Sequence, residues 1–349
     1  MGEIRRLALG GAARREPERL LAALADRVLP GEQPEDAAPR LEQRVATLLG
    51  KPAALMFATG TMAQQVALRI HAEARGTRTV AFHPQCHLEV WEHKGYEHVH
   101  GLHSVLLGNR HELITLSDVD GLVEPIAALL LELPQRDLGG LLPSWDDLVA
   151  QTEAARSRGA AVHMDGARLW EAQPFYGRSH AEIAALFDSV YVSVYKGLMA
   201  PSGAVLAGEE DFIAHARLWR DRLGGNVDRV WPLAMAAERG LDELLPRMGE
   251  FCLRAKAIAA ALGRIDGVRI APSAPQTPMF HLHLSAPAAR VREAIKQLAD
   301  EVGLALPSHV QIGDHPELCK VELCVNEHFD EVTDQEISDL VEEVLNRAR

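Results

Sequence analysis

The sequence is poor in aromatic residues and cysteine, and it has no long hydrophobic run. Phe, Trp and Tyr make up 5% of the 349 residues, and 4 residues are cysteines. No apolar run approaches the roughly 20 residues that a membrane-spanning helix requires, so we expect no membrane partner. The cysteines are scattered rather than spaced as a disulfide framework: Cys86, Cys252, Cys319 and Cys324. Because the N-terminus also has no apolar signal core, we expect reduced thiols in a cytoplasmic protein.

Positive charge is also scarce. The chain has 36 Lys and Arg residues against 49 Asp and Glu residues, and its formal net charge is −13. Proteins that bind nucleic acid present a basic face, so this balance argues against a nucleic-acid partner. No Gly-x-Gly-x-x-Gly segment follows a predicted strand, which disfavours a nicotinamide dehydrogenase.

What the chain does contain is a regular alternation of apolar runs and helical segments. Hydrophobic residues make up 47% of the sequence, and the length fits a large domain plus a smaller one. Strand-like runs occur at Ala53–Phe57, Thr79–Phe82, Ala127–Leu133, Ala160–Met164, Val190–Val194 and Ala204–Ala207. Strands separated by helices predict crossover connections, and therefore an α/β fold with a mostly parallel central sheet covered on both faces.

The pattern changes at about residue 240. Residues 280–284 and 320–325 alternate like strands of a half-exposed sheet, and helical segments accompany them at about 288–302 and 334–347. This indicates a smaller C-terminal α+β domain. We therefore expect an N-terminal arm over residues 1–39, a large domain over 40–240 and a small domain over 241–349.

Two predicted strands end in an acid and an amine. Asp165 follows the Ala160–Met164 strand, Lys196 follows the Val190–Val194 strand, and a glycine comes after each. Ligands bind outside the carboxyl ends of such strands, so we expect both side chains in one cleft. An amine that forms a Schiff base and an acid that keeps a pyridine nitrogen protonated are what pyridoxal 5'-phosphate (PLP) requires. The alternatives are that Asp165 only caps the following helix and that Arg168 is a surface residue.

A third segment supplies a candidate phosphate site. Thr59-Gly60-Thr61 lies between an apolar run and a helix, where free backbone N–H groups and the helix dipole attract phosphate. On its own the segment is also an ordinary helix N-cap. The segment indicates a phosphate site only in combination with the acid and the amine.

Three segments together resemble the L-threonine aldolase / β-eliminating lyase family. They are Thr59–Ala63, His163-Met-Asp-Gly-Ala-Arg168 and Tyr195-Lys-Gly-Leu-Met-Ala-Pro-Ser-Gly203. The resemblance runs from about residue 40 to 225. It implies the fold type I architecture of PLP-dependent transferases (aspartate-aminotransferase-like), with the large domain binding PLP. It also implies a carbon–carbon lyase of amino acid metabolism that works as a homodimer or homotetramer with shared active sites.

The resemblance assigns roles to individual residues. Lys196 forms the Schiff base, Asp165 faces the ring nitrogen, and Arg168 contacts the phenolic oxygen of the ring. His87 stacks on the ring, and Glu92 matches an acidic position just after it. The full cofactor-binding set is Gly60, Thr61, His87, Asp165, Arg168, Lys196 and Arg229. The catalytic set is Lys196, His87 and Asp165.

The implied reaction is retro-aldol cleavage of a β-hydroxy-α-amino acid to glycine and an aldehyde, with His87 as the candidate base. The arginine with which the family binds the substrate carboxylate falls on Glu322 here. That leaves four candidates for the carboxylate: Arg136, Arg229, Lys320 and His309. Glu322 in place of that arginine makes an alternative reaction plausible, which is β-elimination or transfer on another amino acid. A non-catalytic relic of the fold is a further alternative.

The histidines allow one more interpretation. Seven lie between residues 83 and 111, and most are expected at the surface. His83 and His87 are four residues apart with Cys86 between them, which is a conceivable metal site. No second ligand cluster accompanies them, so we expect no metal. His281 and His283 share one strand face and are interpreted as packing residues.

Overall fold

The computed structural model describes residues 7–8, 17–25, 27, 31 and 33–349. The chain forms two compact units. Among the described residues, the larger contains those within 17–138 and 142–245, and the smaller contains residues 7–8, 139–141 and 246–349. Nearly half of the expected N-terminal arm lies outside the described residues. Within it, helix α1 spans Pro17–Ala25, and strand β1 (Leu7–Ala8) pairs in parallel with β11 (Leu304–Ala305).

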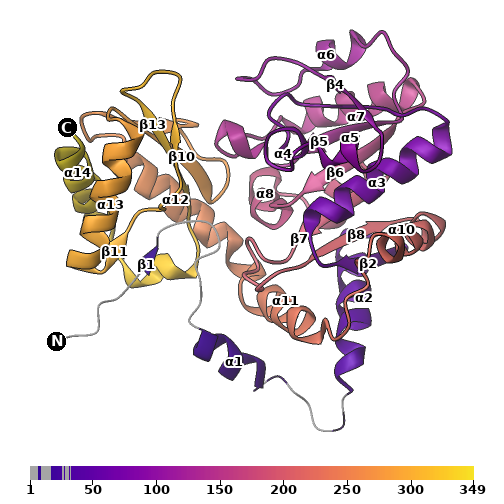
Figure 1. Ribbon diagram of the computed structural model, residues 1–349, viewed down its shortest axis with the longest axis horizontal. Helices are drawn as coiled ribbons and strands as arrows, with labels where there is room; N and C mark the ends of the chain where they lie inside the picture. The colour runs from indigo at the N-terminus through magenta and orange to yellow at the C-terminus, as the bar shows by residue number, and fades with distance from the viewer. Residues whose placement is uncertain (1–6, 9–16, 26, 28–30, 32) are drawn as a thin grey trace. The chain divides into compact units, whose positions relative to one another are not determined.

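A seven-stranded sheet forms the centre of the larger unit (Figure 1), in the order β2-β8-β7-β6-β5-β3-β4. The strands are β2 (Ala53–Phe57), β3 (Thr79–Phe82), β4 (His103–Leu106), β5 (Ala128–Glu132), β6 (Ala161–Gly166), β7 (Ser189–Ser193) and β8 (Ala204–Gly208). The strands from β7 to β4 are parallel, and β8 is antiparallel to both of its neighbours. The predicted mostly parallel sheet is therefore confirmed.

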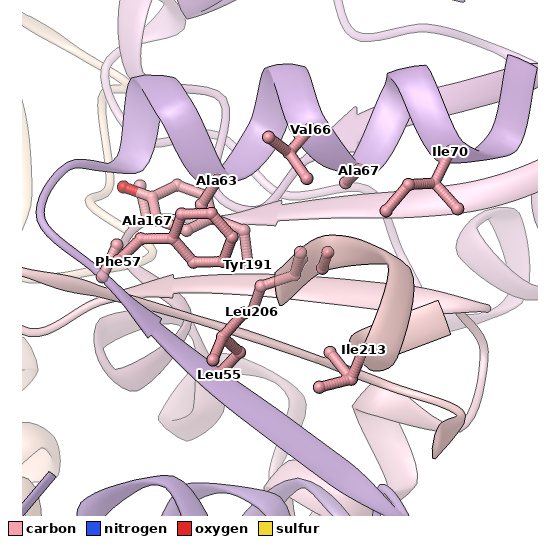
Figure 2. Close-up of a cluster of buried hydrophobic side chains, with 12 residues drawn as sticks. Leu55, Phe57, Ala63, Val66, Ala67, Ile70, Ala167, Tyr191, Leu206 and Ile213 are labelled. Atoms are coloured by element: carbon pink, nitrogen blue, oxygen red, sulfur yellow. The ribbon is translucent and has the colours of Figure 1, made fainter. Parts of the chain in front are cut away.

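Both faces of this sheet are covered. Every residue of β5, β6, β7 and β8 is buried, and successive side chains of a strand point to opposite faces, so neither face of these strands meets solvent. Helix α3 (Gly60–Arg75) packs on several strands, and α10 (Glu210–Arg222) packs on α3. On that face Leu55, Phe57 and Leu206 form one core cluster with Val66 of α3 and Ile213 of α10 (Figure 2).

The remaining helices of the larger unit connect or flank these strands. They are α2 (Ala37–Leu49), α4 (His87–Val90), α5 (Gly95–His98), α6 (Leu116–Asp120), α7 (Trp145–Ser157), α8 (Leu169–Tyr176), α9 (His180–Ala184) and α11 (Trp231–Glu243). Several of these helices begin with a residue whose side chain caps the first turn. In α7, the hydroxyl of Ser144 accepts a hydrogen bond from the N–H of Asp147. None of the described helices is long and apolar enough to cross a bilayer.

The smaller unit has its own sheet and core. Four antiparallel strands lie in the order β12-β13-β10-β9, with bounds Val310–Ile312, Cys319–Cys324, Met279–Leu284 and Val268–Ala271. Helices α12 (Met248–Leu262), α13 (Ala288–Val302) and α14 (Asp334–Ala348) pack beside the sheet and on one another. The predicted smaller C-terminal α+β domain is therefore observed. The two units separate after residue 245, beyond the end of α11.

Candidate active site

Asp165 lies at the carboxyl end of β6 with one oxygen of its carboxyl group unpaired. The side chain is 1% exposed, and its Oδ1 accepts from the backbone N–H of Ala167 at 3.0 Å. Its Oδ2 is buried and has no hydrogen-bond partner among the described residues. The N-cap of α8 is Arg168, so Asp165 is not the cap of that helix. A buried acceptor without a partner is costly, so Oδ2 marks the position of a missing donor.

Lys196 lies in the turn that follows β7. The hydroxyl oxygen of Ser193 accepts from the N–H groups of Tyr195 and Lys196, at 3.2 and 3.3 Å, which fixes the start of the turn. Gly203 closes it with φ +117°, and a Cβ there would lie 3.0 Å from Val194 Cγ2. The turn therefore requires glycine at that position.

The pKa of Lys196 is lowered to about 8. Burial is the main cause, the Arg168 guanidinium lowers the pKa further, and Asp165 opposes both effects. Burial correspondingly raises the pKa of Asp165, while Lys196 and His87 act to lower it. Asp165 is therefore within electrostatic reach of both the Lys196 amine and the His87 imidazole. A lysine in this range supplies neutral amine, the nucleophilic form, near physiological pH.

Arg168 is buried rather than at the surface. It is 6% exposed, and its Nε lies 3.6 Å from Oε2 of Glu171, which is also buried. The alternative of an ordinary surface arginine is therefore wrong. A buried guanidinium whose charge reaches Lys196 is suited to an anionic oxygen of a ligand.

The first turn of α3 presents free backbone donors. The Thr59 side chain caps the helix by accepting from the N–H of Met62 at 3.3 Å, and the N–H of Ala63 bonds to the Thr59 carbonyl. The N–H groups of Gly60 and Thr61 precede the first bond of the helix and have no intrahelical partner. Gly60 is buried, Thr61 is exposed, and the arrangement fits the predicted phosphate site.

His87 is the first residue of α4 and is held by Glu92. Its Nδ1 donates to Glu92 Oε1 at 2.9 Å, and the Glu92 side chain is 3% exposed. The other oxygen of Glu92 accepts from Gln65 Nε2 at 3.3 Å. A neutral ring that donates through Nδ1 has a free acceptor at Nε2, which is the form a general base requires.

Glu132 belongs to the same region, although the sequence analysis did not select it. It ends β5 and lies opposite Asp165 in the register of β5 and β6. Its oxygens accept from the N–H of Arg136 at 3.1 Å and from Gln135 Nε2 at 2.9 Å. Burial, and then the charge of Asp165, raise the pKa of Glu132 to about 8. A polar residue at the end of an otherwise apolar run was the signal that would have found it.

The turn after β5 is also joined to the segment that carries His87. Gln135 Nε2 donates to the carbonyl of Gln85 at 3.1 Å, and Trp91 Nε1 donates to Asp137 Oδ2 at 2.7 Å. The Arg136 guanidinium lies over the Trp91 ring at 5.0 Å. These contacts flank His87 on both sides in the sequence, so they fix the backbone from which its ring projects.

Two further residues that the sequence analysis singled out are Arg229 and His281. The Arg229 side chain is 82% exposed and its Nε lies 3.7 Å from Asp228, so a cofactor role for Arg229 stays a prediction. His281 is buried in the smaller unit opposite Glu322, with 3.8 Å between Nε2 and Oε2. A packing role for His281 stays a prediction.

The conceivable metal pair is not formed. Nε2 of His83 donates to the carbonyls of Asn109 and Glu112, at 3.0 and 2.8 Å, and its Nδ1 accepts from the N–H of Gln85. Both ring nitrogens of His83 are therefore occupied. Across the described residues, no three His, Cys, Asp or Glu side chains are grouped so that they could hold a metal ion.

The residues present fit PLP. The unpaired Oδ2 of Asp165 suits a protonated pyridine nitrogen, and Lys196 suits the aldehyde. Arg168 suits the phenolic oxygen, and the N–H groups of Gly60 and Thr61 suit the phosphate. All of these residues belong to the larger unit.

Comparisons with known proteins agree with this fit. Residues 22–285 match the beta-eliminating lyase family. Low-specificity L-threonine aldolase 1 of Arabidopsis thaliana is 29% identical over 282 residues, which cover 78% of this chain and 78% of that protein. A crystal structure from Listeria monocytogenes, described as an L-allo-threonine aldolase, has a TM-score of 0.90 at 35% identity, covering 99% of this chain and 97% of that one.

A more distant structure bears on the fold alone. Aspartate aminotransferase from Thermus thermophilus has a TM-score of 0.70 at 20% identity, covering 97% of this chain and 98% of that one. The predicted aspartate-aminotransferase-like architecture is confirmed.

Proposed function

The chain belongs to the beta-eliminating lyase family, and we propose that it cleaves a threonine-like β-hydroxy-α-amino acid to glycine and an aldehyde. It is a PLP-dependent lyase, as its motifs predicted. The observation that carries the proposal is the buried, unpaired Oδ2 of Asp165 within electrostatic reach of a lysine whose pKa is lowered to about 8. The relatives named as threonine aldolases support the choice of substrate class.

PLP, when bound, supplies an aldehyde for covalent attachment and a cationic ring that accepts the electrons of the breaking Cα–Cβ bond. Lys196 provides the amine that holds it. Asp165 keeps the ring nitrogen protonated, because a facing carboxylate favours the cationic form. Arg168 stabilises negative charge on the phenolic oxygen, since a buried guanidinium has no competing water.

His87 is the base in this proposal. Retro-aldol cleavage requires removal of the proton from the β-hydroxyl group as the Cα–Cβ bond breaks. Nε2 of His87 accepts that proton, directly or through water, while Nδ1–H remains bonded to Glu92. Glu92 then stabilises the imidazolium that results, because its carboxyl group lies 2.9 Å away.

The assembly is part of the proposal. We infer a homodimer or homotetramer in the cytoplasm, with active sites shared between subunits. The exposed position of Arg229 supports this, because its side chain is accessible to a second copy of the chain. Light scattering of the purified protein measures the subunit number.

The test is an assay of the purified protein with defined amino acids. Yellow protein that releases aldehyde from threonine or phenylserine is the expected result. Yellow protein that forms pyruvate and ammonia from serine, but no aldehyde from threonine, would replace the aldolase with a β-eliminating enzyme. Protein that stays colourless with added PLP would identify a relic of the fold. Lys196→Ala is the control, and it should abolish turnover while thermal unfolding remains cooperative.

A further inference from the structure

Tyr191 is a buried tyrosine whose hydroxyl group reaches the first turn of α3. It lies in β7, opposite Asp165 of β6 in the parallel register, and is 2% exposed. Its ring belongs to the core cluster under α3, with Phe57, Ala63 and Ala167 around it (Figure 2). The cluster therefore holds the ring in one position.

The Tyr191 hydroxyl approaches Gly60 closely. A Cβ on Gly60 would overlap the Tyr191 hydroxyl oxygen, and the next nearest atoms are Cζ and Cε2 of the same ring. The hydroxyl group thus lies directly beside the residue whose N–H begins the helix. Glycine at position 60 therefore makes room for the phenol.

The phenol lacks an acceptor. None of the hydrogen bonds among the described residues involves the Tyr191 hydroxyl, and the orphaned Oδ2 of Asp165 shows that the neighbouring carboxyl does not take its proton. Tyr191 as a residue is buried, and the hydroxyl group of a buried tyrosine usually has a partner. Burial, and then the charge of Asp165, raise the pKa of Tyr191 well above its ordinary value, so the group stays protonated and available as a donor.

We propose that the Tyr191 hydroxyl donates a hydrogen bond to the phosphate group bound at the first turn of α3. The inference rests on the proposed function, since the phosphate is that of PLP. Gly60 and Thr61 supply backbone donors on the helix side, and Tyr191 supplies a side-chain donor from the sheet side. Phosphate oxygens have lone pairs for all three donors, and a bond to a charged acceptor is stronger than one between neutral groups.

Tyr191→Phe tests this with protein from which the cofactor has been removed. The variant should bind PLP about tenfold or more weakly, the loss expected for a hydrogen bond to a charged group. Its affinity for pyridoxal, which has the same ring and aldehyde but no phosphate, should not change. Inorganic phosphate should protect the wild type from thermal unfolding more than it protects the variant. Tyr176→Phe is the matched control, because the Tyr176 hydroxyl donates to the carbonyl of Pro143 at 3.2 Å.

Each outcome distinguishes the inference from the proposed function. Equal weakening of PLP and pyridoxal would place the hydroxyl against the ring and overturn the inference. Unchanged binding of PLP would overturn it as well. Wild-type protein that binds neither PLP nor pyridoxal would instead remove the cofactor assignment, and the inference with it.

A second measurement covers the case in which Tyr191→Phe does not fold. The chain has 4 tyrosines, so the wild type labelled with 3-fluorotyrosine gives four fluorine resonances. Phe variants of Tyr96, Tyr176 and Tyr195 assign the fourth resonance to Tyr191 by elimination. Inorganic phosphate should shift that resonance. A resonance that phosphate leaves unmoved, at concentrations that protect the protein from thermal unfolding, would also overturn the inference.

Discussion

Glu132 and Asp165 are buried carboxyl groups that face each other in adjacent parallel strands, at one position of the register between β5 and β6. Two neighbouring carboxylates cannot both ionise without cost, so the protein divides the roles between them. Lys196 and His87 favour the charged form of Asp165, whereas Asp165 itself helps to raise the pKa of Glu132 to about 8. At neutral pH Glu132 is therefore mostly the protonated partner.

This division predicts how stability depends on pH. The pKa of Glu132 is about 8 in the folded protein against an ordinary value of 4.5, so the folded protein retains a proton that the unfolded chain releases. The free energy of unfolding should therefore fall as pH rises from about 4.5 to 8. Glu132→Gln removes this dependence. It should cost about 1 kcal/mol near pH 5, because the hydrogen bond from Gln135 is lost, and should become the more stable form towards pH 8.

Urea unfolding of the wild type and of Glu132→Gln at pH 5.5, 7 and 8.5 measures the effect. Two pH profiles that remain parallel would show that Glu132 has the same pKa in the folded and unfolded chains. Glu124→Gln is the control, because Glu124 is an exposed carboxyl group in the same unit.

The reactivity of Lys196 should follow its lowered pKa. Only the neutral amine attacks an aldehyde, so the rate at which protein without cofactor takes up PLP should rise with pH, with a midpoint near 8. Arg168 lowers the pKa of Lys196 and Asp165 raises it. Arg168→Gln should therefore move the midpoint to higher pH, and Asp165→Asn should move it to lower pH. Stopped-flow absorbance from pH 6 to 10 records both shifts, and two shifts in the same direction would contradict the assignment.

Much of this site follows from the sequence, because continuous apolar runs that end in polar residues mark strands of a parallel sheet. β2 and β3 have the predicted bounds. β6 continues two residues beyond its predicted end, since the N–H of Leu133 bonds to the carbonyl of Asp165 and pairs the strand with β5 there. β4 was not predicted, because it is a partly exposed edge strand that begins with His103.

Other features have no signal along the chain. Gln65 lies within α3 and matters only because folding brings it to Glu92. Tyr191 has the pattern of an ordinary apolar strand residue, and its hydroxyl becomes notable only when Gly60 is placed beside it. The roles of such residues depend on contacts between segments that are distant in the sequence. The periodicity of hydrophobic residues along the chain does not predict those contacts.

The His87–Glu92 pair predicts two different losses of activity. His87→Ala removes the base and should lower kcat by about 10² to 10⁴-fold. Glu92→Gln retains the ring but removes the anion that stabilises its charged form, so its loss should be smaller, roughly 10-fold. Glu97→Gln, an exposed acid on α5, is the control and should match the wild type.

A double-mutant cycle on kcat separates these roles. Glu92→Gln should slow the wild type but should not slow His87→Ala further, because Glu92 acts only through the imidazole. An unchanged rate in Glu92→Gln would show that Glu92 does not act through His87. Wild-type rates in His87→Ala would place the base elsewhere.

The contact between Gly60 and Tyr191 predicts a coupling in stability. Gly60→Ala forces a methyl group against the phenol and should cost about 1 to 3 kcal/mol, the usual range for overpacking a core. Tyr191→Phe removes the nearest atom but leaves Cζ and Cε2, so it should recover only part of that loss in the double variant. A double-mutant cycle by urea unfolding measures the coupling. Gly249→Ala is the control, because nothing lies within 4 Å of a Cβ there and an α-helix favours alanine. Additive changes at residues 60 and 191 would mean that α3 shifts to accommodate the methyl group, which would also remove the close contact on which the Tyr191 donor depends.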